Sequence, residues 1–251
     1  MTDSIPKIVH YCWFGGKSKS ASVLRFIRSW GEMLPDYKII EWNESNFDIN
    51  SYEYTQQAHA CGRFAFVSDV AHLHALYTYG GIYLDTDVEI RRCFDDLIMD
   101  DVVLGFEEGN YIATSTIISP PAAKLIYDFL ESYKCRKFLR DDGSEDRTTN
   151  VEKLTLMLES CGLKRDGSNQ ILSWKGDSIR IFDRVKFSPL DYPNGIDYAD
   201  QTTYAIHHFG HSWGNPISRA KAYLRKLLIR TIGGGRMKRI REIVSSKNIN
   251  R

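Results

Sequence analysis

Two carboxylates, Asp85 and Asp87, stand one residue apart at the end of a short apolar run. The run Ile82-Tyr83-Leu84 follows Gly80-Gly81, a pattern typical of a buried strand entered through a turn. Residues i and i+2 of an extended chain project to the same side, so the two carboxylates lie together. Two anions this close repel unless a cation lies near them, and hard oxygen ligands suit Mg2+ or Mn2+ bound jointly with phosphate. The pair therefore indicates metal-assisted departure of a nucleotide diphosphate.

An Asp-x-Asp pair by itself is a weak signal, because a solvated surface turn has the same appearance. The strand and the glycine turn before it favour a site, since α/β proteins bind ligands where strands end. A calcium loop of the EF-hand type requires glycine at its sixth position, where this chain has Ile90. The haloacid-dehalogenase phosphatase pattern needs Thr or Val two residues after the second aspartate, and here Glu89 occupies that position.

A second unusual cluster is His207-His208-Phe209-Gly210-His211-Ser212-Trp213, which follows the apolar run Tyr204-Ala205-Ile206. Neutral imidazole is a common ligand for Mn2+-like ions beside carboxylates. In an extended segment His207 and His208 point in opposite directions, so only one of them reaches a given metal. The alternative is an exposed polar strand end. The residues themselves do not say which histidine is the ligand.

Four further residues have both a structural and a functional interpretation. Ser68-Asp69 fits a helix cap slightly better than a site, since Ser caps turns and Asp favours a helix N-terminus. His72 lies one turn after Asp69 on the same face, where a lone histidine is usually structural. Trp13 stands at a strand end before two glycines, and it fits either the core or a flat surface for a nucleotide base.

Along the chain, segments with the apolar pattern of strands alternate with segments that have the apolar spacing of helices. Apolar runs predict strands, and apolar residues at helical spacing predict helices between them. A strand, a helix and a strand at the N-terminus indicate a βαβ unit and a parallel sheet, hence an α/β fold with chemistry at the strand ends. Strands are expected at 8–14, 37–42, 82–84, 102–106, 180–188 and 203–208, helices around 23–30, 64–79, 124–133 and 151–161, and a polar loop at 141–146.

The bulk composition describes a globular chain with an uneven charge distribution. The 251 residues, 43% hydrophobic and 26% charged, fit one domain with a substantial core. Of 33 Lys and Arg, 11 lie in 219–251 with one acid, which leaves 22 bases against 31 acids before them. We therefore expect a catalytic domain at 1–216 and basic amphipathic helices at 217–251. Such helices lie on anionic membranes, whereas the acidic body would repel nucleic acid.

Cysteine usage and hydropathy bear on location. Five scattered cysteines without a CxxC pair indicate neither a disulfide framework nor a zinc site, and they fit reduced thiols in the cytoplasm. No apolar run resembles a signal peptide or approaches the roughly 20 residues of a spanning helix. We expect a cytoplasmic protein, peripheral to the inner membrane face if the tail binds lipid.

Taken together, these segments resemble the family-32 glycosyltransferases, which include bacterial capsule and O-antigen sugar transferases and yeast mannosyltransferases. The clostridial glucosylating toxins are more distantly similar in their catalytic domains. The resemblance spans residues 5 to about 213 and leaves the basic tail outside. It is carried, in order, by residues 5–16, 41–43, 64–69, 79–87 and 207–213.

The resemblance implies a GT-A fold, a sugar-nucleotide donor and retention of the anomeric configuration. By position, Trp13 would stack on the donor base and Asp69 would hydrogen-bond the donor sugar. Asp85 would contact ribose or sugar, and Asp87 would bind the metal. A further metal ligand would come from His208, or from His207 by a different alignment. At the position of His72, a further substrate contact, family members commonly have Arg. The other implied substrate contacts are Trp213 near the diphosphate, Tyr11, Phe14, Ser68 and Tyr83.

We therefore expect a metal-dependent retaining glycosyltransferase with Mn2+ or Mg2+ as cofactor and Asp85, Asp87 and Asp69 as catalytic residues. The donor is expected to be a UDP-sugar, with GDP-mannose as the alternative, and the acceptor a surface saccharide, lipid-linked or free. No residue is an obvious nucleophile with an adjacent base, so we expect front-face attack rather than double displacement. The alternatives are a non-catalytic sugar-nucleotide-binding protein and a phosphatase that uses the same aspartates.

Overall fold

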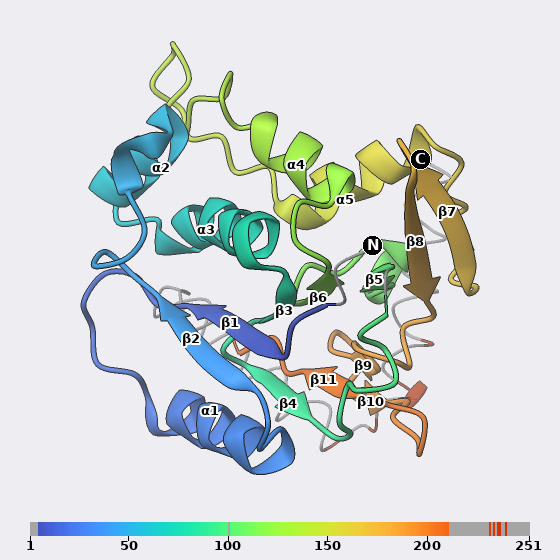
Figure 1. Ribbon diagram of the computed structural model, residues 1–251. Helices are drawn as coiled ribbons and strands as arrows, with labels where there is room; N and C mark the ends of the chain where they lie inside the picture. The colour runs from blue at the N-terminus through green and yellow to red at the C-terminus, as the bar shows by residue number, and fades with distance from the viewer. Residues whose placement is uncertain are drawn as a thin grey trace.

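A seven-stranded sheet forms the centre of the computed structural model, which describes residues 5–99, 101–210, 231, 233, 235, 236 and 239 (Figure 1). Five strands run in one direction, and β6 and β7 run against them. The predicted α/β class with a mostly parallel sheet is therefore confirmed. In spatial order the strands are β2 (Lys38–Trp42), β1 (Ile8–Cys12), β3 (Gly81–Leu84), β6 (Thr116–Ser119), β5 (Val102–Gly105), β8 (Asp177–Phe182) and β7 (Gln170–Trp174).

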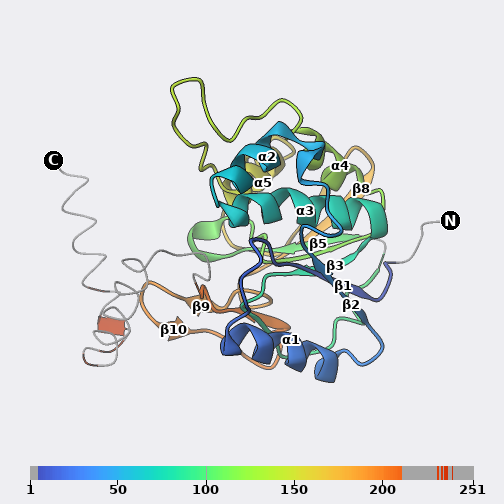
Figure 2. The same cartoon turned by 90° about the vertical axis from the view of Figure 1, so that its left-hand side faces the viewer.

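Helices cover the sheet on both faces (Figures 1 and 2). One face carries four helices, and the other carries α1 (Ala21–Met33) with two small two-stranded sheets. Two short 3-10 turns, Ile49–Ser51 and Glu108–Asn110, complete the set. The four helices are α2 (Glu53–Ala60), α3 (Phe64–Tyr79), α4 (Lys124–Glu131) and α5 (Asn150–Glu159), and the small sheets pair β4 (Val88–Ile90) with β11 (Ala205–His207) and β9 (Leu190–Asp191) with β10 (Ile196–Asp197).

Helix α3 is the central element of the four-helix layer. It packs against β1 and β3 below and against α2 and α4 beside it. A helix that is apolar on most of its circumference is stable only when it is enclosed in this way. Eight of its residues are buried, namely Val67, Ser68, Val70, Ala71, His72, Leu73, Ala75 and Leu76. This enclosure makes α3 a rigid support for any polar side chain that it carries toward a site.

The glycine turn between α3 and β3 directs the strand toward its carboxylates. Gly80 and Gly81 both have positive φ, at 63° and 107°. The His10 ring fixes this turn, because its Nε2 bonds the Gly80 carbonyl at 2.8 Å while its Nδ1 accepts from the Trp42 indole at 3.1 Å. The tight approach of β1 to Gly81 leaves no room for a side chain, since a Cβ there would lie 2.6 Å from the Ile8 carbonyl oxygen.

Several elements were absent from the sequence prediction. Helix α2 buries only Tyr54, Thr55 and Ala58, so its apolar stripe is too narrow to stand out. Strand β6 is buried along its whole length, and such runs are not distinguished from a buried helix by periodicity. The strand expected at 180–188 ends at Phe182, and residues 183–188 form a turn outside the strand. The Ser68-Asp69 cap interpretation is wrong, because α3 already begins at Phe64.

The structure bears on two features considered in the sequence, the cysteines and the length of apolar helices. All five cysteines are free. Within the described part of the chain, no helix has the length and apolar character needed to cross a membrane. Trp213, and almost all of the predicted basic helices of 217–251, lie outside the described residues.

Gly81→Ala is expected to destabilise the protein by roughly 3 kcal/mol or more, because it adds steric overlap to a strained positive φ. Gly16→Ala is the matched control, since Gly16 has φ of +63° but nothing lies within 4 Å of the position that an added Cβ would take. This control should lose only the roughly 1–2 kcal/mol of backbone strain. Urea unfolding of both variants measures the difference, and equal losses would contradict the packing argument.

Candidate functional site

The two aspartates stand on the turn between β3 and β4, at the carboxyl end of a central strand. The Asp85 N–H donates to the Ser115 carbonyl at 2.9 Å, which continues the β3–β6 pairing by one residue. The Tyr83 hydroxyl donates to Asp85 Oδ1 at 2.7 Å and orients that carboxylate. The Gly210 N–H donates to Asp87 Oδ2 at 2.5 Å. Each carboxylate is thus held by a neighbouring group before any ligand is present.

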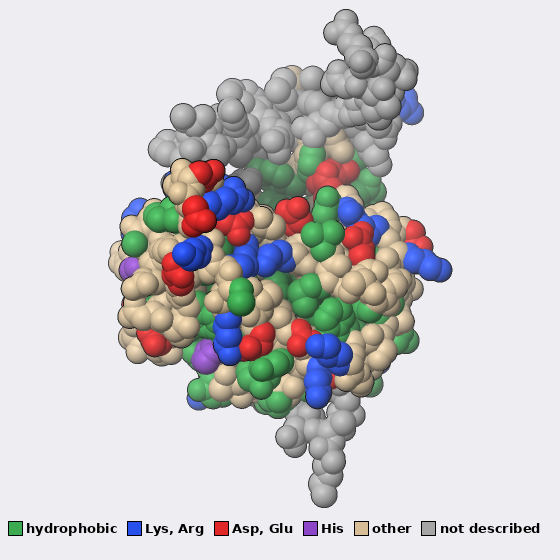
Figure 3. Space-filling model, turned by 90° about the horizontal axis from the view of Figure 1, so that it is seen from above, with side chains coloured by type: hydrophobic (Ala, Val, Ile, Leu, Met, Phe, Trp, Pro, Cys, Tyr) green, Lys and Arg blue, Asp and Glu red, His purple; other side chains and the backbone are tan. Residues whose placement is uncertain are grey.

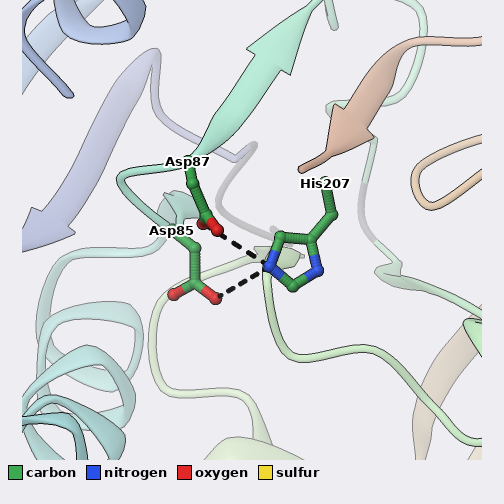
Figure 4. Close-up of side chains that lie close together, drawn as sticks. All are labelled: Asp85, Asp87 and His207. Carbon is green, nitrogen blue, oxygen red and sulfur yellow. Dashed lines mark ion pairs between the residues drawn. The ribbon is translucent and has the colours of Figure 1, made fainter. Parts of the chain in front are cut away.

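His207 faces both carboxylates (Figure 4). Its Nε2 lies 3.4 Å from Asp87 Oδ1 and 3.9 Å from Asp85 Oδ2. The antiparallel pairing of β11 with β4 sets His207 opposite Val88, and this register places the ring beside the aspartates. Among the described residues, Asp85, Asp87 and His207 form a group whose ligand atoms lie within 4.8 Å of one another.

His208 points away from this group, as the alternation of an extended segment predicts. Its Nε2 pairs with Glu89 Oε2 at 2.8 Å, and its ring stacks on Phe26 at a centroid distance of 5.1 Å. The backbone N–H of His208 still contributes, because it donates to the Asp87 carbonyl at 3.1 Å. The geometry therefore brings His207 to the carboxylates and not His208.

A cleft of about 240 Å³ opens beside the carboxylates. Its wall combines the end of β1, the α3 face, the β3–β4 turn and the segment after β11. Ser68, Asp69, Tyr83, Asp85, Asp87 and His207 all lie on it, so six of the predicted site residues share one cavity. The complete lining is Cys12, Ala65, Ser68, Asp69, Tyr83, Asp85, Thr86, Asp87, His207 and Phe209.

Electrostatics in the cleft follow from burial and from the close charges. Burial and the charge of Asp87 raise the pKa of Asp85 to about 6. Burial opposes ionisation of Asp87, but pairing with His207 outweighs it and lowers the pKa of Asp87 to about 2. Burial likewise opposes a charge on His207, yet Asp87 and Asp85 raise its pKa to about 9. At neutral pH the imidazolium therefore supplies the positive charge that the two carboxylates need.

This donor set fits a hard divalent cation. Two carboxylate oxygens and one imidazole nitrogen converge from different strands, and this mixture suits Mn2+ and Mg2+ better than soft metals. The His207 Nδ1 is buried without a hydrogen-bond partner among the described residues, so no hydrogen bond there fixes which ring nitrogen carries the proton once the ring is neutral. The expected divalent site is thus supported by the geometry, while the identity of the metal stays a prediction.

Three aromatic residues predicted to contact the substrate, with Trp13 on the donor base, lie in the core at or just after the end of β1. Trp13 is only 9% exposed, and its indole N–H donates to the Lys17 carbonyl at 2.6 Å. The Tyr11 hydroxyl donates to Glu41 at 2.5 Å. Phe14 is fully buried and packs on Phe47, so it presents no surface in this structure. Base stacking by Trp13 stays a prediction.

Sequence reasoning missed three contributors to the site. Phe209 lines the cleft and packs its ring on His207 at 4.1 Å. Gly210 approaches Asp87 so closely that a Cβ would lie 3.2 Å from its carboxylate oxygen. Glu107, two residues beyond β5, adds a carboxylate to those of Asp69, Asp85 and Asp87, and its pKa is raised by burial and by Asp85. The Phe-Gly step directly after the two histidines was the available signal for the first two.

The family comparison agrees with this geometry. Residues 20–104 match the family described as the glycosyltransferase sugar-binding region containing the DXD motif, and Asp85 and Asp87 lie inside the match. The resemblance to DXD-containing glycosyltransferases is therefore confirmed, on an α/β fold with a mostly parallel central sheet.

Curated relatives cover part of the chain. Inositol phosphoceramide mannosyltransferase 3 of Schizosaccharomyces pombe is 26% identical over 147 residues, which is 50% of this chain and 40% of that protein. Glucan organizing enzyme 1 of Cryptococcus neoformans var. grubii is 35% identical over 81 residues, which is 28% of this chain and 22% of that protein. The chain thus matches less than half the length of either relative.

A solved structure gives a weaker likeness over most of the chain. The glycosyltransferase involved in the glycosylation of the major capsid of PBCV-1 is 11% identical at a TM-score of 0.47, covering 86% of this chain and 98% of that one.

The affinity for Mn2+ is expected to rise with pH. A metal needs neutral imidazole, and the raised pKa of His207 means that a proton must leave before binding. The affinity should increase about tenfold per pH unit between 7 and 8 and level off near pH 9, as competition by one proton requires. Calorimetric titration with Mn2+ and UDP across this range checks it. A pH-independent affinity above pH 7 would contradict the assignment of His207.

Replacing the two histidines separately tests which one binds the metal together with Asp85 and Asp87. His207→Ala removes a nitrogen that converges with Asp85 and Asp87, so binding of Mn2+ with UDP should weaken by about 100-fold or more. His208→Ala removes only the Glu89 pair and the Phe26 stack, so the affinity should change less than about threefold. The opposite ranking in the same titration would assign the role to His208.

Proposed function

We propose that this chain is a metal-dependent, retaining glycosyltransferase that moves a hexose from a nucleotide sugar to a saccharide acceptor. The convergence of Asp85, Asp87 and His207 at one cleft supports this proposal most strongly. The match of residues 20–104 to the DXD sugar-binding region supports the donor class independently. Retention of configuration is an expectation carried by the family resemblance.

Different residues would interact with the diphosphate and with the sugar of the donor. Asp85 and Asp87, with His207 once it has lost its proton, would hold the divalent ion. The ion, when bound, acts as a Lewis acid on the departing diphosphate. Tyr83 keeps Asp85 in place through its 2.7 Å hydrogen bond, and Asp69 lines the cleft where the sugar hydroxyls would lie.

The transfer exchanges one carbon–oxygen bond for another. The acceptor oxygen bonds to the anomeric carbon from the face that the diphosphate leaves, and the bond to the diphosphate oxygen breaks. The hydroxyl proton passes to that departing phosphate oxygen, so no protein base is required. Trapping of a covalent sugar adduct on a cleft side chain would overturn this front-face route.

The donor and acceptor are proposed at the level of class. UDP-hexoses are the first candidates, and GDP-mannose is the second. The Schizosaccharomyces pombe relative is named as a mannosyltransferase of inositol phosphoceramide, which favours keeping mannose in any donor panel. The proposed acceptor is a capsule or O-antigen saccharide, carried on a lipid at the cytoplasmic membrane face. The basic tail 217–251 would provide the membrane contact.

Asp87→Ala is expected to lower turnover by about 10³-fold, because it removes a ligand of the ion that stabilises the leaving group. The assay measures nucleoside diphosphate released from UDP-glucose, UDP-galactose and GDP-mannose, with and without Mn2+. Asp36→Ala, in an exposed turn after α1, is the control and should keep full turnover.

The products of the same assay separate the alternatives. Release of inorganic phosphate in place of nucleoside diphosphate would indicate a phosphatase. Binding of a nucleotide sugar with Mn2+, but no product with any saccharide acceptor, would indicate a binding protein.

A further inference from the structure

A buried polar cluster stands behind the cleft, within the four-helix layer. Its members come from separate elements, namely Tyr54 from α2, Asp69 and His72 from α3, Tyr133 and Arg136 from the segment after α4, and Asn150 from α5. Only Asp69 also lines the cleft. Because buried polar groups are costly unless they are hydrogen-bonded or paired, any member left without a partner calls for an explanation.

Arg136 is the charged centre of the cluster. Its guanidinium lies 4.6 Å from the ring centroids of both Tyr54 and Tyr133, so it is held between two aromatic faces. Its Nε and Nη2 donate to Asp146 Oδ2 at 3.2 Å and 2.6 Å. Its Nη1 is buried and has no hydrogen-bond partner among the described residues. One donor edge of a fixed cation is therefore still unused.

Asn150 joins three members of the cluster through its side-chain amide. Its Oδ1 accepts a short hydrogen bond from the Tyr133 hydroxyl, and its Nδ2 donates to the Asp69 carbonyl at 2.9 Å. The same Nδ2 lies 3.2 Å from His72 Nε2, so that nitrogen must accept and the ring carries its proton on Nδ1. Burial lowers the pKa of His72 to about 3. His72 is thus neutral and brings no positive charge to this end of the cleft.

Asp69 is the member of the cluster whose carboxylate is affected by the charges of the other members. Its carboxylate makes no hydrogen bond or ion pair with another residue of the described ranges, although its backbone carbonyl is held by Asn150. Burial and the charge of Asp85 raise its pKa to about 8, and Arg136 is the cation that opposes this effect. Lys153 also lies in the cluster, 5.3 Å from the Tyr133 ring, but burial and the Arg136 charge lower its own pKa to about 8. Arg136 is therefore the dependable positive charge behind Asp69.

We propose that Arg136 is a positioning residue for the donor sugar: from behind the cleft, its guanidinium stabilises the Asp69 carboxylate while that carboxylate accepts hydrogen bonds from hydroxyls of the transferred hexose. This inference rests on the proposed function, because it assumes that the cleft binds a nucleotide sugar. It assigns recognition of the hexose to Asp69 of α3, supported from behind by Arg136 of the segment after α4, and recognition of the diphosphate to the β3–β4 turn and β11.

The outer side of the same segment provides a matched control. Arg140 pairs with the same carboxylate as Arg136, at 3.4 Å from Asp146 Oδ1, but its side chain is 54% exposed. Basic and acidic side chains are interspersed on the face shown in Figure 3. Near Arg140 in the chain, Glu145 pairs with both Arg63 and Arg147. Arg140→Met therefore removes one arginine partner of Asp146, as Arg136→Met does, but it leaves the buried cluster intact.

The test compares two affinities in the presence of Mn2+, that of each nucleotide sugar and that of its nucleoside diphosphate. The probes are UDP-glucose and UDP-galactose against UDP, and GDP-mannose against GDP. Arg136→Met should weaken binding of the preferred nucleotide sugar about tenfold or more, which corresponds to one lost charge-assisted interaction, and leave the diphosphate within about twofold. Arg140→Met should leave both affinities within about twofold. Equal weakening of both ligands by Arg136→Met, or no weakening of either, would overturn the inference.

Asp69→Asn supplies the second arm. If Arg136 acts through Asp69, adding Arg136→Met to Asp69→Asn should cost less than about twofold in nucleotide-sugar affinity, because the carboxylate is already gone. Additive losses would overturn the inference. Should Arg136→Met fail to fold, Arg136→Lys keeps a charge but not the planar fork, and it should weaken only the nucleotide sugar. A wild-type chain that binds neither UDP nor GDP with Mn2+ would overturn the proposed function itself and this inference with it.

Discussion

Mutual repulsion between Asp85 and Asp87 is the constraint on which the site depends. The strand geometry forces both carboxylates to one side, and the low-dielectric cleft strengthens their repulsion. His207 relieves it, with its Nε2 at 3.4 Å and 3.9 Å from the two carboxylates. A divalent ion would relieve it more completely, because it brings two charges and bonds both oxygens directly. The protonated ring thus holds the place of the ion and must lose its proton when the ion enters.

The fold makes this arrangement possible by joining distant parts of the chain. The Gly80-Gly81 turn, fixed by the His10 ring, aims β3 so that its last residues reach the cleft. The β4–β11 pairing returns the chain more than a hundred residues later to place His207 opposite Val88. Helix α3, enclosed on most sides, holds Asp69 at the other wall of the cleft. Rigid support on each side fixes charges that would otherwise move apart.

The sequence alone predicts the features that depend on residues close to one another in the chain. The α/β class follows from alternating periodicities, and the Asp-x-Asp pair is recognisable because its strand and turn are adjacent to it. The choice between His207 and His208 was not accessible, since it depends on the register of β11 against β4, a non-local pairing. The Arg136 cluster was equally hidden, because burial inside the helical layer comes from packing and not from any pattern around Arg136.

Proton release on metal binding tests the central claim most directly. Calorimetry of Mn2+ binding with UDP at pH 8, in two buffers of different ionisation enthalpy, reports the number of protons released per ion. Because the pKa of His207 is raised to about 9, the account predicts release of close to one proton, and its loss in His207→Gln. Binding of Mn2+ without proton release, or release that persists unchanged in His207→Gln, would contradict the account.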